Sequence, residues 1–315
     1  MGNFQSDSNN AAANDGRASS RAGLSAERAA YLLLLPTLAV LAGLAVFPTL
    51  YAMWQSLRIE LIYNPAASRF VGLQTYIGLF QDPFAIKAFG ITALWVAAVL
   101  VVQLPVGLAI ALLLDREIRS AWLLRTLIIL PVFVSPIAMG LTWRYLFEPV
   151  SGVINWVLKS LGLGTSLWLS SPNTALVSVL IADSWQWIPF VAVILLAGIQ
   201  GISTEVIEAA RLDGLKGLAF VRRMILPLIW PILVVVVLIR MVDSIRAFDL
   251  FYIMTRGGPG SSTLVSGVYG FTMFETGRLS DMAALGIILL VVINVLATLA
   301  LRILSRGEKS KGAKP

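Results

Sequence analysis

The sequence predicts an all-α membrane protein that crosses the bilayer six times. Of its 315 residues, 58% are hydrophobic and only 13% are charged, against about 45–50% apolar residues in an ordinary soluble domain. The apolar residues gather in six runs of about twenty, the length that a helix needs to cross a bilayer core of about 30 Å. Basic residues concentrate in alternate connections between these runs, as the positive-inside rule expects. A soluble enzyme is therefore excluded.

The composition also restricts the chemistry. The chain has no Cys and no His, so zinc sites and Ser-His or Cys-His catalysis lack their key residue. It has no Gly-x-x-x-x-Gly-Lys-[Ser/Thr] loop, so this chain is not expected to bind ATP. We expect no catalytic residues, no metal and no cofactor. The net charge of +7 on so apolar a chain indicates contact with anionic membrane lipid rather than with nucleic acid.

Six spans within one region, residues 29–304, account for most of the chain. Residues 1–28 are rich in Asn, Ala and Ser, so we expect a disordered tail, and residues 305–315 form a second, basic tail. The first run has 24 residues, too many for the roughly 7–15 apolar residues of a cleavable signal peptide, so it should remain as an anchor. The predicted spans are residues 31–54, 89–114, 126–147, 174–200, 226–250 and 282–301.

The basic residues predict which connections face the cytoplasm. Segments 1–28, 115–120, 201–226 and 302–315 carry fourteen Lys and Arg, whereas segments 58–84, 148–173 and 255–281 carry five. The first set should be cytoplasmic, which puts both termini inside a multi-pass protein of the cell inner membrane. Within the opposite set, residues 153–161 have the spacing of a short amphipathic helix, with Trp156 suited to the membrane interface.

The connection between the fourth and fifth spans, residues 201–226, is the most informative segment. Ser203 or Thr204 can begin a helix, Glu205 lies in its first turn, and Gly214 marks its end. This predicts about nine residues, or roughly 13 Å of helix, followed by a second amphipathic stretch before Pro227. The two short helices form either a rigid knob that enters a groove of a partner or a loop that rests on the membrane.

The residues of this loop resemble a known family. Glu208-Ala209-Ala210, then Gly214 after three residues, Met224 after nine more and Leu226-Pro227 match the EAA loop of inner-membrane permeases of binding-protein-dependent ABC importers. The only departure is Met224 where the family usually has Ile, a volume-conserving change. Further segments resemble the carbohydrate branch, which includes sugar and glycerol-phosphate permeases: residues 70–76, 111–116, 125–126 with 130–131, Trp143 with Asn155, and 255–259 with Thr263.

The resemblance implies a type I importer permease fold and a set of partners. The chain would form half of a heterodimeric pore with a second, related permease. Two cytosolic ATPase subunits would bind the ATP, and a periplasmic or lipid-anchored solute-binding protein would deliver a carbohydrate. By the match, the residues that couple to the ATPase are Glu208, Ala209, Ala210, Asp213, Gly214, Leu226 and Pro227.

Charges inside the spans are the candidates for a substrate pathway, because each costs at least about 2.5–3.5 kcal/mol to insert. Arg240, Asp243, Arg246 and Asp249 repeat every three residues and can instead pair with one another as a ladder. Asp183 lies beside Trp185, Gln186 and Trp187, a combination suited to hydroxyl groups and the apolar face of a sugar. The alternative is that Asp183 pairs with Arg144 or Arg240 across helices.

The sequence therefore predicts the permease subunit of an ATP-driven importer for a sugar, polyol or related carbohydrate. Three other interpretations compete with it. An ion-coupled secondary transporter would use the membrane carboxylates as a relay, although no inverted repeat is evident. An importer permease for a non-carbohydrate solute would share the fold and the coupling loop. A membrane scaffold would use its cytosolic loop only to recruit a partner.

Overall fold

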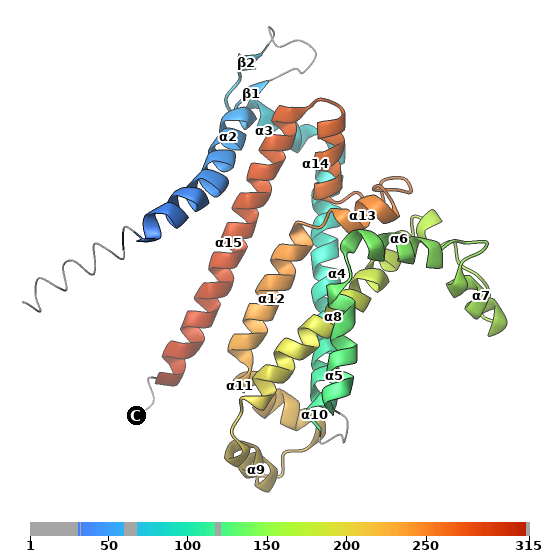
Figure 1. Ribbon diagram of the computed structural model, residues 1–315, viewed down its shortest axis with the longest axis vertical. Coiled ribbons are helices and arrows are strands. Elements are labelled where there is room, and N and C mark those ends of the chain that lie inside the picture. Colours follow the sequence, from blue (N-terminus) through green and yellow to red (C-terminus); the bar gives the residue numbers. More distant parts are fainter. Residues whose placement is uncertain (1–30, 32, 60–67, 117–120, 313–315) are drawn as a thin grey trace, which may run out of the picture. The chain divides into compact units, whose positions relative to one another are not determined.

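The computed structural model describes residues 31, 33–59, 68–116 and 121–312 (Figure 1). The predicted disordered tail, residues 1–28, lies outside this part. The chain divides into two units, one ending at Gln55 and the other beginning at Ser56. Within these residues the regular elements are helices, apart from one antiparallel ribbon with two residues in each strand, so the all-α prediction is confirmed. The elements are η1 Ala42–Val46, α2 Phe47–Ser56, β1 Arg58–Ile59, β2 Arg69–Phe70, α3 Gln74–Gln81, α4 Pro83–Leu114, α5 Ala121–Ile129, η3 Leu130–Phe133, α6 Pro136–Leu146, α7 Val153–Ser160, η4 Trp168–Ser170, α8 Ala175–Gln200, α9 Thr204–Leu212, α10 Gly217–Phe220, η5 Val221–Ile225, α11 Leu226–Leu228, α12 Trp230–Ile245, α13 Asp249–Met254, α14 Ser266–Glu275 and α15 Leu279–Gly312.

The described part of the first unit lies in the helical stretch Leu33–Ser56, whose last residue already belongs to the second unit. This stretch is long and apolar enough to cross a membrane. It includes a π-helical turn, η1, where the Phe47 amide donates to the Ala42 carbonyl. Pro48 follows this turn and cannot donate a backbone hydrogen bond, and its ring crowds the preceding carbonyls.

Three long helices of the second unit coincide with predicted spans and are long and apolar enough to cross a membrane, namely α4, α8 and the Leu279–Ile303 part of α15. Helix α4 begins six residues before its prediction because of its cap. The Asp82 Oδ1 atom accepts a hydrogen bond from the Phe84 amide at 2.9 Å, and Pro83 occupies the first turn, where its missing N–H costs nothing.

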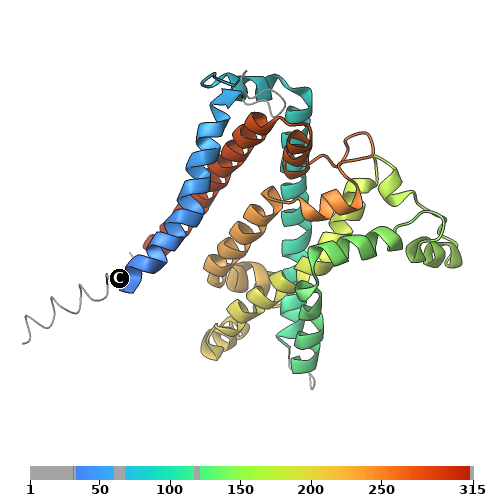
Figure 2. The ribbon, with the colours of Figure 1, turned by 45° about the horizontal axis from the view of Figure 1, so that its top comes forward.

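The two other predicted spans are broken rather than continuous. Within 126–147, helices Trp122–Phe133 and Pro136–Leu146 meet at 94° (Figure 2). Val134 and Ser135 are extended there, because Pro136 disfavours the helical conformation of the residue before it. Within 226–250, helices Gly217–Leu228 and Trp230–Ile245 meet at 79°. The described residues thus contain four continuous helices that are long and apolar enough to cross a membrane, or six candidate spans when each bent pair counts as one.

Helix α4 packs along α8, and α8 packs on α12, at small residues. A Cβ atom added to Gly107 would lie 2.5 Å from the Val191 side chain, and one added to Gly198 would lie 2.7 Å from that of Ile232. Small residues allow this close approach of helices inside a membrane. The packing forms two buried clusters. One is near α13 and α14, around Trp95, and the other lies near α9.

Candidate functional site

The predicted loop helix is confirmed as α9, with nine residues from Thr204 to Leu212. Gly214 adopts a φ of +79°, the left-handed conformation that favours glycine. Its amide donates to the Arg211 carbonyl at 3.0 Å, and the Leu215 amide donates to the Ala210 carbonyl at 3.1 Å. These two bonds form a Schellman turn, which ends the helix in a fixed direction.

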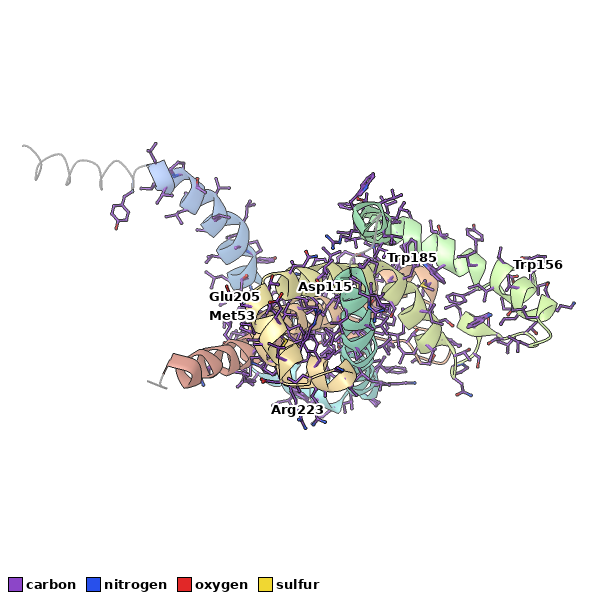
Figure 3. The ribbon with its side chains drawn as sticks, turned by 90° about the horizontal axis from the view of Figure 1, so that it is seen from below. Met53, Asp115, Trp156, Trp185, Glu205 and Arg223 are labelled. Atoms are coloured by element: carbon purple, nitrogen blue, oxygen red, sulfur yellow. The ribbon has the colours of Figure 1, made fainter. Side chains whose placement is uncertain are left out.

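The structure divides the predicted coupling residues into exposed and buried groups. Glu208, Ala209, Asp213 and Gly214 are exposed, and Figure 3 looks onto this end of the second unit, where Glu205 and Arg223 are labelled. Ala210 is only 8% exposed and packs inward against the cluster that includes Met224 and Ile225. Of the Ala209–Ala210 pair, only Ala209 is therefore available to a partner.

The sequence did not predict that two apolar residues of this loop would be exposed. Leu212 is 90% exposed and Leu218 is 82% exposed, at the end of α9 and within α10. Both side chains are therefore open to contact with another molecule. For Leu212 the signal in the sequence was an apolar residue two positions before Gly214, at the end of the short helix.

A buried polar network lies where α4, α8 and α12 meet. The Arg240 guanidinium bonds the Asp183 carboxylate at 2.8 Å and the Asp243 carboxylate at 2.7 Å. Gln103 donates to Asp183 Oδ2 at 2.7 Å and accepts from Arg240 Nε at 3.0 Å. The Arg240 side chain is 1% exposed, and its guanidinium carbon lies 4.5 Å from the centre of the Trp187 ring.

This network selects among the sequence-based alternatives for the intramembrane charges. Asp183 pairs with Arg240, one of its two proposed partners. The charge ladder forms only in its first step, because no hydrogen bond or ion pair within the described residues joins Arg246 or Asp249 to another side chain. Gln103 was missed, although an amide in an otherwise apolar, uncharged span was a visible signal.

A small cavity of about 110 Å³ adjoins the network. It brings together five of the six predicted pathway residues: Asp183, Gln186, Trp187, Asp243 and Arg246. The sixth, Trp185, is 44% exposed and lines separate apolar cavities instead. Gln186 is held by a hydrogen bond from its Nε2 atom to the Val134 carbonyl at 2.6 Å, which ties α8 to the break before α6. Ligand pockets usually measure about 300–1,000 Å³, so this cavity alone is too small for a sugar.

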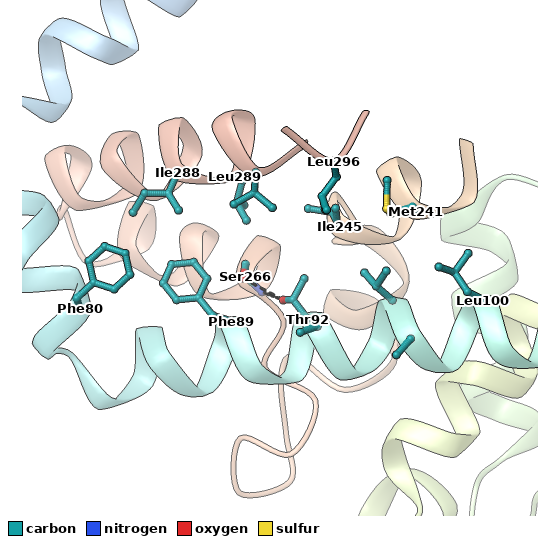
Figure 4. Close-up of a pocket in the computed structure, with 14 residues that line it drawn as sticks. Phe80, Phe89, Thr92, Leu100, Met241, Ile245, Ser266, Ile288, Leu289 and Leu296 are labelled. Carbon is teal, nitrogen blue, oxygen red and sulfur yellow. Dashed lines mark hydrogen bonds between the residues drawn. The ribbon is translucent and has the colours of Figure 1, made fainter. Parts of the chain in front are cut away.

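A larger cavity, about 640 Å³, lies between α4, α12, α14 and α15 (Figure 4). Its lining is apolar apart from Thr92 and Ser266. These two residues satisfy each other, since Thr92 Oγ1 accepts from the Ser266 amide at 2.8 Å and lies 3.0 Å from the Ser266 hydroxyl. Thr92 Oγ1 also donates to the Ala88 carbonyl at 2.7 Å, so both hydroxyl protons are used within the protein and the rest of the lining is apolar.

A second charged cluster lies at the junctions between α3 and α4 and between α14 and α15. Arg278 bonds Asp82 at 3.3 Å and Asp281 at 2.6 Å, and the Tyr269 hydroxyl donates to Asp82. Burial by itself would raise the pKa of Asp82, but the hydrogen bonds from Tyr269, the Phe84 amide and Arg278 hold that pKa below its ordinary value of 3.8. Burial and the hydrogen bond to Asp82 raise the pKa of Tyr269 above 10.0.

Comparison with known proteins assigns this geometry to a group of membrane proteins. The family model "Binding-protein-dependent transport system inner membrane component" matches residues 103–310. A trehalose/maltose transport system permease protein, MalF of Thermococcus litoralis, is 30% identical over 84% of this chain and 89% of its own length. The sn-glycerol-3-phosphate transport system permease protein UgpA of Yersinia pseudotuberculosis is 32% identical over 91% of this chain and 98% of its own.

The fold is shared with a solved transporter. A chain in the crystal structure of a bacterial ABC transporter involved in the import of the acidic polysaccharide alginate superposes with a TM-score of 0.76. The two chains are 23% identical, and the match covers 88% of this chain and 94% of that one. At this identity the match supports the type I importer fold alone.

Proposed function

Since the chain belongs to the family of binding-protein-dependent transport system inner membrane components, we propose that it is the permease subunit of an ATP-driven carbohydrate importer. It is a multi-pass protein of the inner membrane, and its family consists of transporter subunits rather than enzymes. The observation that carries the proposal is the EAA loop, folded as a nine-residue helix with a fixed turn, in a chain whose named relatives carry sugars or glycerol phosphate.

The chain would form half of the translocation pore. We expect it to pair with a second, related permease, with two cytosolic ATPase subunits that bind the ATP, and with a periplasmic or lipid-anchored solute-binding protein. The polar cavity measures about 110 Å³, which is too small for a sugar. This size supports a substrate site that is formed jointly by this chain and the second permease.

The α9 loop is the proposed contact with the ATPase. Glu208, Ala209 and Asp213 present polar and small groups, and Leu212 and Leu218 provide the apolar surface that a groove can bury. A displacement of the loop would shift Ala210, and with it Met224 and Ile225, because the three residues pack in the same buried cluster. Leu226 and Pro227 then lead into the 79° bend before α12. A push on α9 thus reaches the helix that carries Arg240 and Asp243.

Gly214→Val tests this coupling, and Gly162→Val is its matched control. Both glycines have a positive φ, +79° and +73°, and neither would bring an added Cβ within 4 Å of another group. Both also end short helices with the same pair of Schellman hydrogen bonds. Valine strains either turn by roughly 1–2 kcal/mol, so the two variants differ in location rather than in local cost.

The measurement is ATP-dependent uptake by the complete importer, together with co-purification of the ATPase. We expect Gly214→Val to lower both by about tenfold or more, the loss that 1.4 kcal/mol produces, while Gly162→Val leaves co-purification unchanged. Equal losses in the two variants would contradict the coupling role. Uptake driven by an ion gradient with no ATPase present would instead establish the secondary transporter, and flux that persists without this chain would favour the scaffold.

A further inference from the structure

We infer that the polar cavity beside the Arg240 network selects uncharged, polyhydroxylated solutes and discriminates against anionic carbohydrates. The inference rests on the proposed importer function and makes its substrate class more specific. It separates this chain from relatives named for a glycerol phosphate and from the alginate transporter whose fold it shares.

The first argument is the charge around the cavity. Its lining includes the carboxylates of Asp183, Asp243 and Asp249 but only one guanidinium, that of Arg246. Arg240 lies behind the lining and already bonds both Asp183 and Asp243. Three carboxylates against two guanidinium groups leave one net negative charge. A bound anion is repelled by this charge, most strongly beside Asp183, whose side chain is only 11% exposed, because water screens little there.

The second argument is a pair of buried polar atoms that have no partner. The Ser244 hydroxyl and the Trp95 indole N–H form no hydrogen bond within the described part of the chain. Both residues line the cavity, and they are only 2% and 1% exposed. Such buried groups are normally satisfied. Because neither atom is accessible in this conformation, a ligand completes them only once the cavity opens. Neither Trp95 nor Ser244 is among the residues that the sequence predicted to line the substrate pathway.

Hydroxyl groups satisfy this arrangement better than an acid group does. A sugar hydroxyl accepts from the Trp95 N–H and at the same time donates to a carboxylate such as Asp249. An ionised carboxylate or phosphate only accepts hydrogen bonds, so it can bind Trp95, Ser244 and Arg246 but faces the acidic side chains without a proton to offer.

Aromatic rings complete the lining. Trp95 meets Phe251 edge to face, with ring centres 4.7 Å apart, which fixes the direction of its indole. Trp187 and Phe248 line the same cavity. Rings of this kind pack against apolar C–H surfaces while polar groups at their edges hold the hydroxyls. The combination of acceptors, orphaned donors and aromatic surface suits a neutral sugar or polyol.

The test compares methyl β-D-glucoside with methyl β-D-glucuronide, which share a ring and differ by one carboxylate. Saturation-transfer NMR on the assembled importer in nanodiscs, with no binding protein added, reports the contact of each probe with the permeases. We expect stronger saturation of the glucoside. Asp249→Asn should raise the glucuronide signal relative to the glucoside several-fold, whereas Asp281→Asn, the same chemical change outside the cavity, should leave the ratio unchanged.

Trp95→Phe tests the orphaned donor separately. Loss of one hydrogen bond of about 1 kcal/mol predicts a roughly fivefold weaker glucoside contact, with the complex still assembled. Saturation of the glucuronide equal to or stronger than that of the glucoside would overturn the inference, as would the absence of saturation for both probes. ATP-dependent uptake, measured on the same preparation with the binding protein present, reports separately whether the importer function itself holds.

Discussion

Two charged clusters in this protein have the same design but different surroundings. In each, one arginine bonds an aspartate three residues later in the chain and a second aspartate far away in sequence. Arg240 bonds Asp243 and Asp183 at 2.7 and 2.8 Å, and Arg278 bonds Asp281 and Asp82 at 2.6 and 3.3 Å. The Arg240 side chain is 1% exposed, whereas that of Arg278 is 44% exposed.

The difference shows that the geometry of an ion pair does not set its contribution to stability. When Arg278 loses a partner, water replaces it, so such exposed pairs contribute about 0–1 kcal/mol. When Arg240 loses a partner, nothing replaces it, because a charge inside a span is stable only with its protein partners. The network around Arg240 is therefore expected to control assembly, and the cluster around Arg278 only to adjust it.

The largest effect is expected for Arg240→Met. It leaves the Asp183 carboxylate, with a side chain only 11% exposed, without a cation, and breaking a buried pair in this way costs about 3–5 kcal/mol. We expect little assembled importer in the membrane, measured as the monodisperse fraction after extraction. Arg278→Met is the matched control and should assemble normally.

The double variant Arg240→Met/Asp183→Asn sharpens this test. Removing the orphaned charge should restore part of the assembled fraction, because buried pairs replaced on both sides often cost little. Equal assembly of Arg240→Met and Arg278→Met, with no rescue to observe, would remove the distinction between the two clusters.

Asp183→Asn should have a smaller effect. The amide still offers an oxygen to Arg240, which also keeps Asp243, so the loss is that of one charge-assisted hydrogen bond, about 1.5–3 kcal/mol. We expect a complex that assembles, melts at a lower temperature and transports more slowly. Asp82→Asn is the corresponding change in the cluster around Arg278. It should lower the melting temperature less, because its partner Arg278 is 44% exposed, although the Asp82 side chain itself is 16% exposed. Failed assembly of Asp183→Asn would mean that Asp243 cannot compensate.

The sequence predicted the features that depend on local patterns. Runs of apolar residues gave the spans, and a glycine after a short amphipathic stretch gave the nine residues of α9. Both signals arise from neighbours within a few turns of helix. The break before α6 also has a local cause, the proline at position 136. It was not predicted because the apolar run around it is long enough to be one continuous span.

The features that it could not predict depend on contacts between distant residues. Gln103 meets Asp183 across 80 positions, and Arg240 meets Asp183 across 57, so the sequence left two partners possible for Asp183. The inward direction of Ala210 depends on a cluster built from α4, α8 and η5. Which predicted pathway residues share the cavity, and that Trp185 does not, likewise follows only from how α8 packs.

The smallest expected effect is the pH dependence of the exposed cluster. The pKa of Asp82 is lowered in the folded chain, so its contribution is present above its ordinary value of 3.8 and is lost as the pH falls through the folded value. The pKa of Tyr269 is raised, so its contribution is present below 10.0 and is lost as the pH rises through the folded value. Between these limits the contribution of the cluster to stability does not change with pH.

Thermal melting of the extracted complex tests this dependence. At pH 6 Asp82→Asn should be less stable than the wild type, by no more than about 1 kcal/mol, the contribution of an exposed pair. The difference in melting temperature should shrink as the pH falls below 4. A difference that instead grew on acidification would mean that the Asp82 carboxylate is not stabilised by Tyr269 and Arg278, and the two clusters would then differ in kind as well as in exposure.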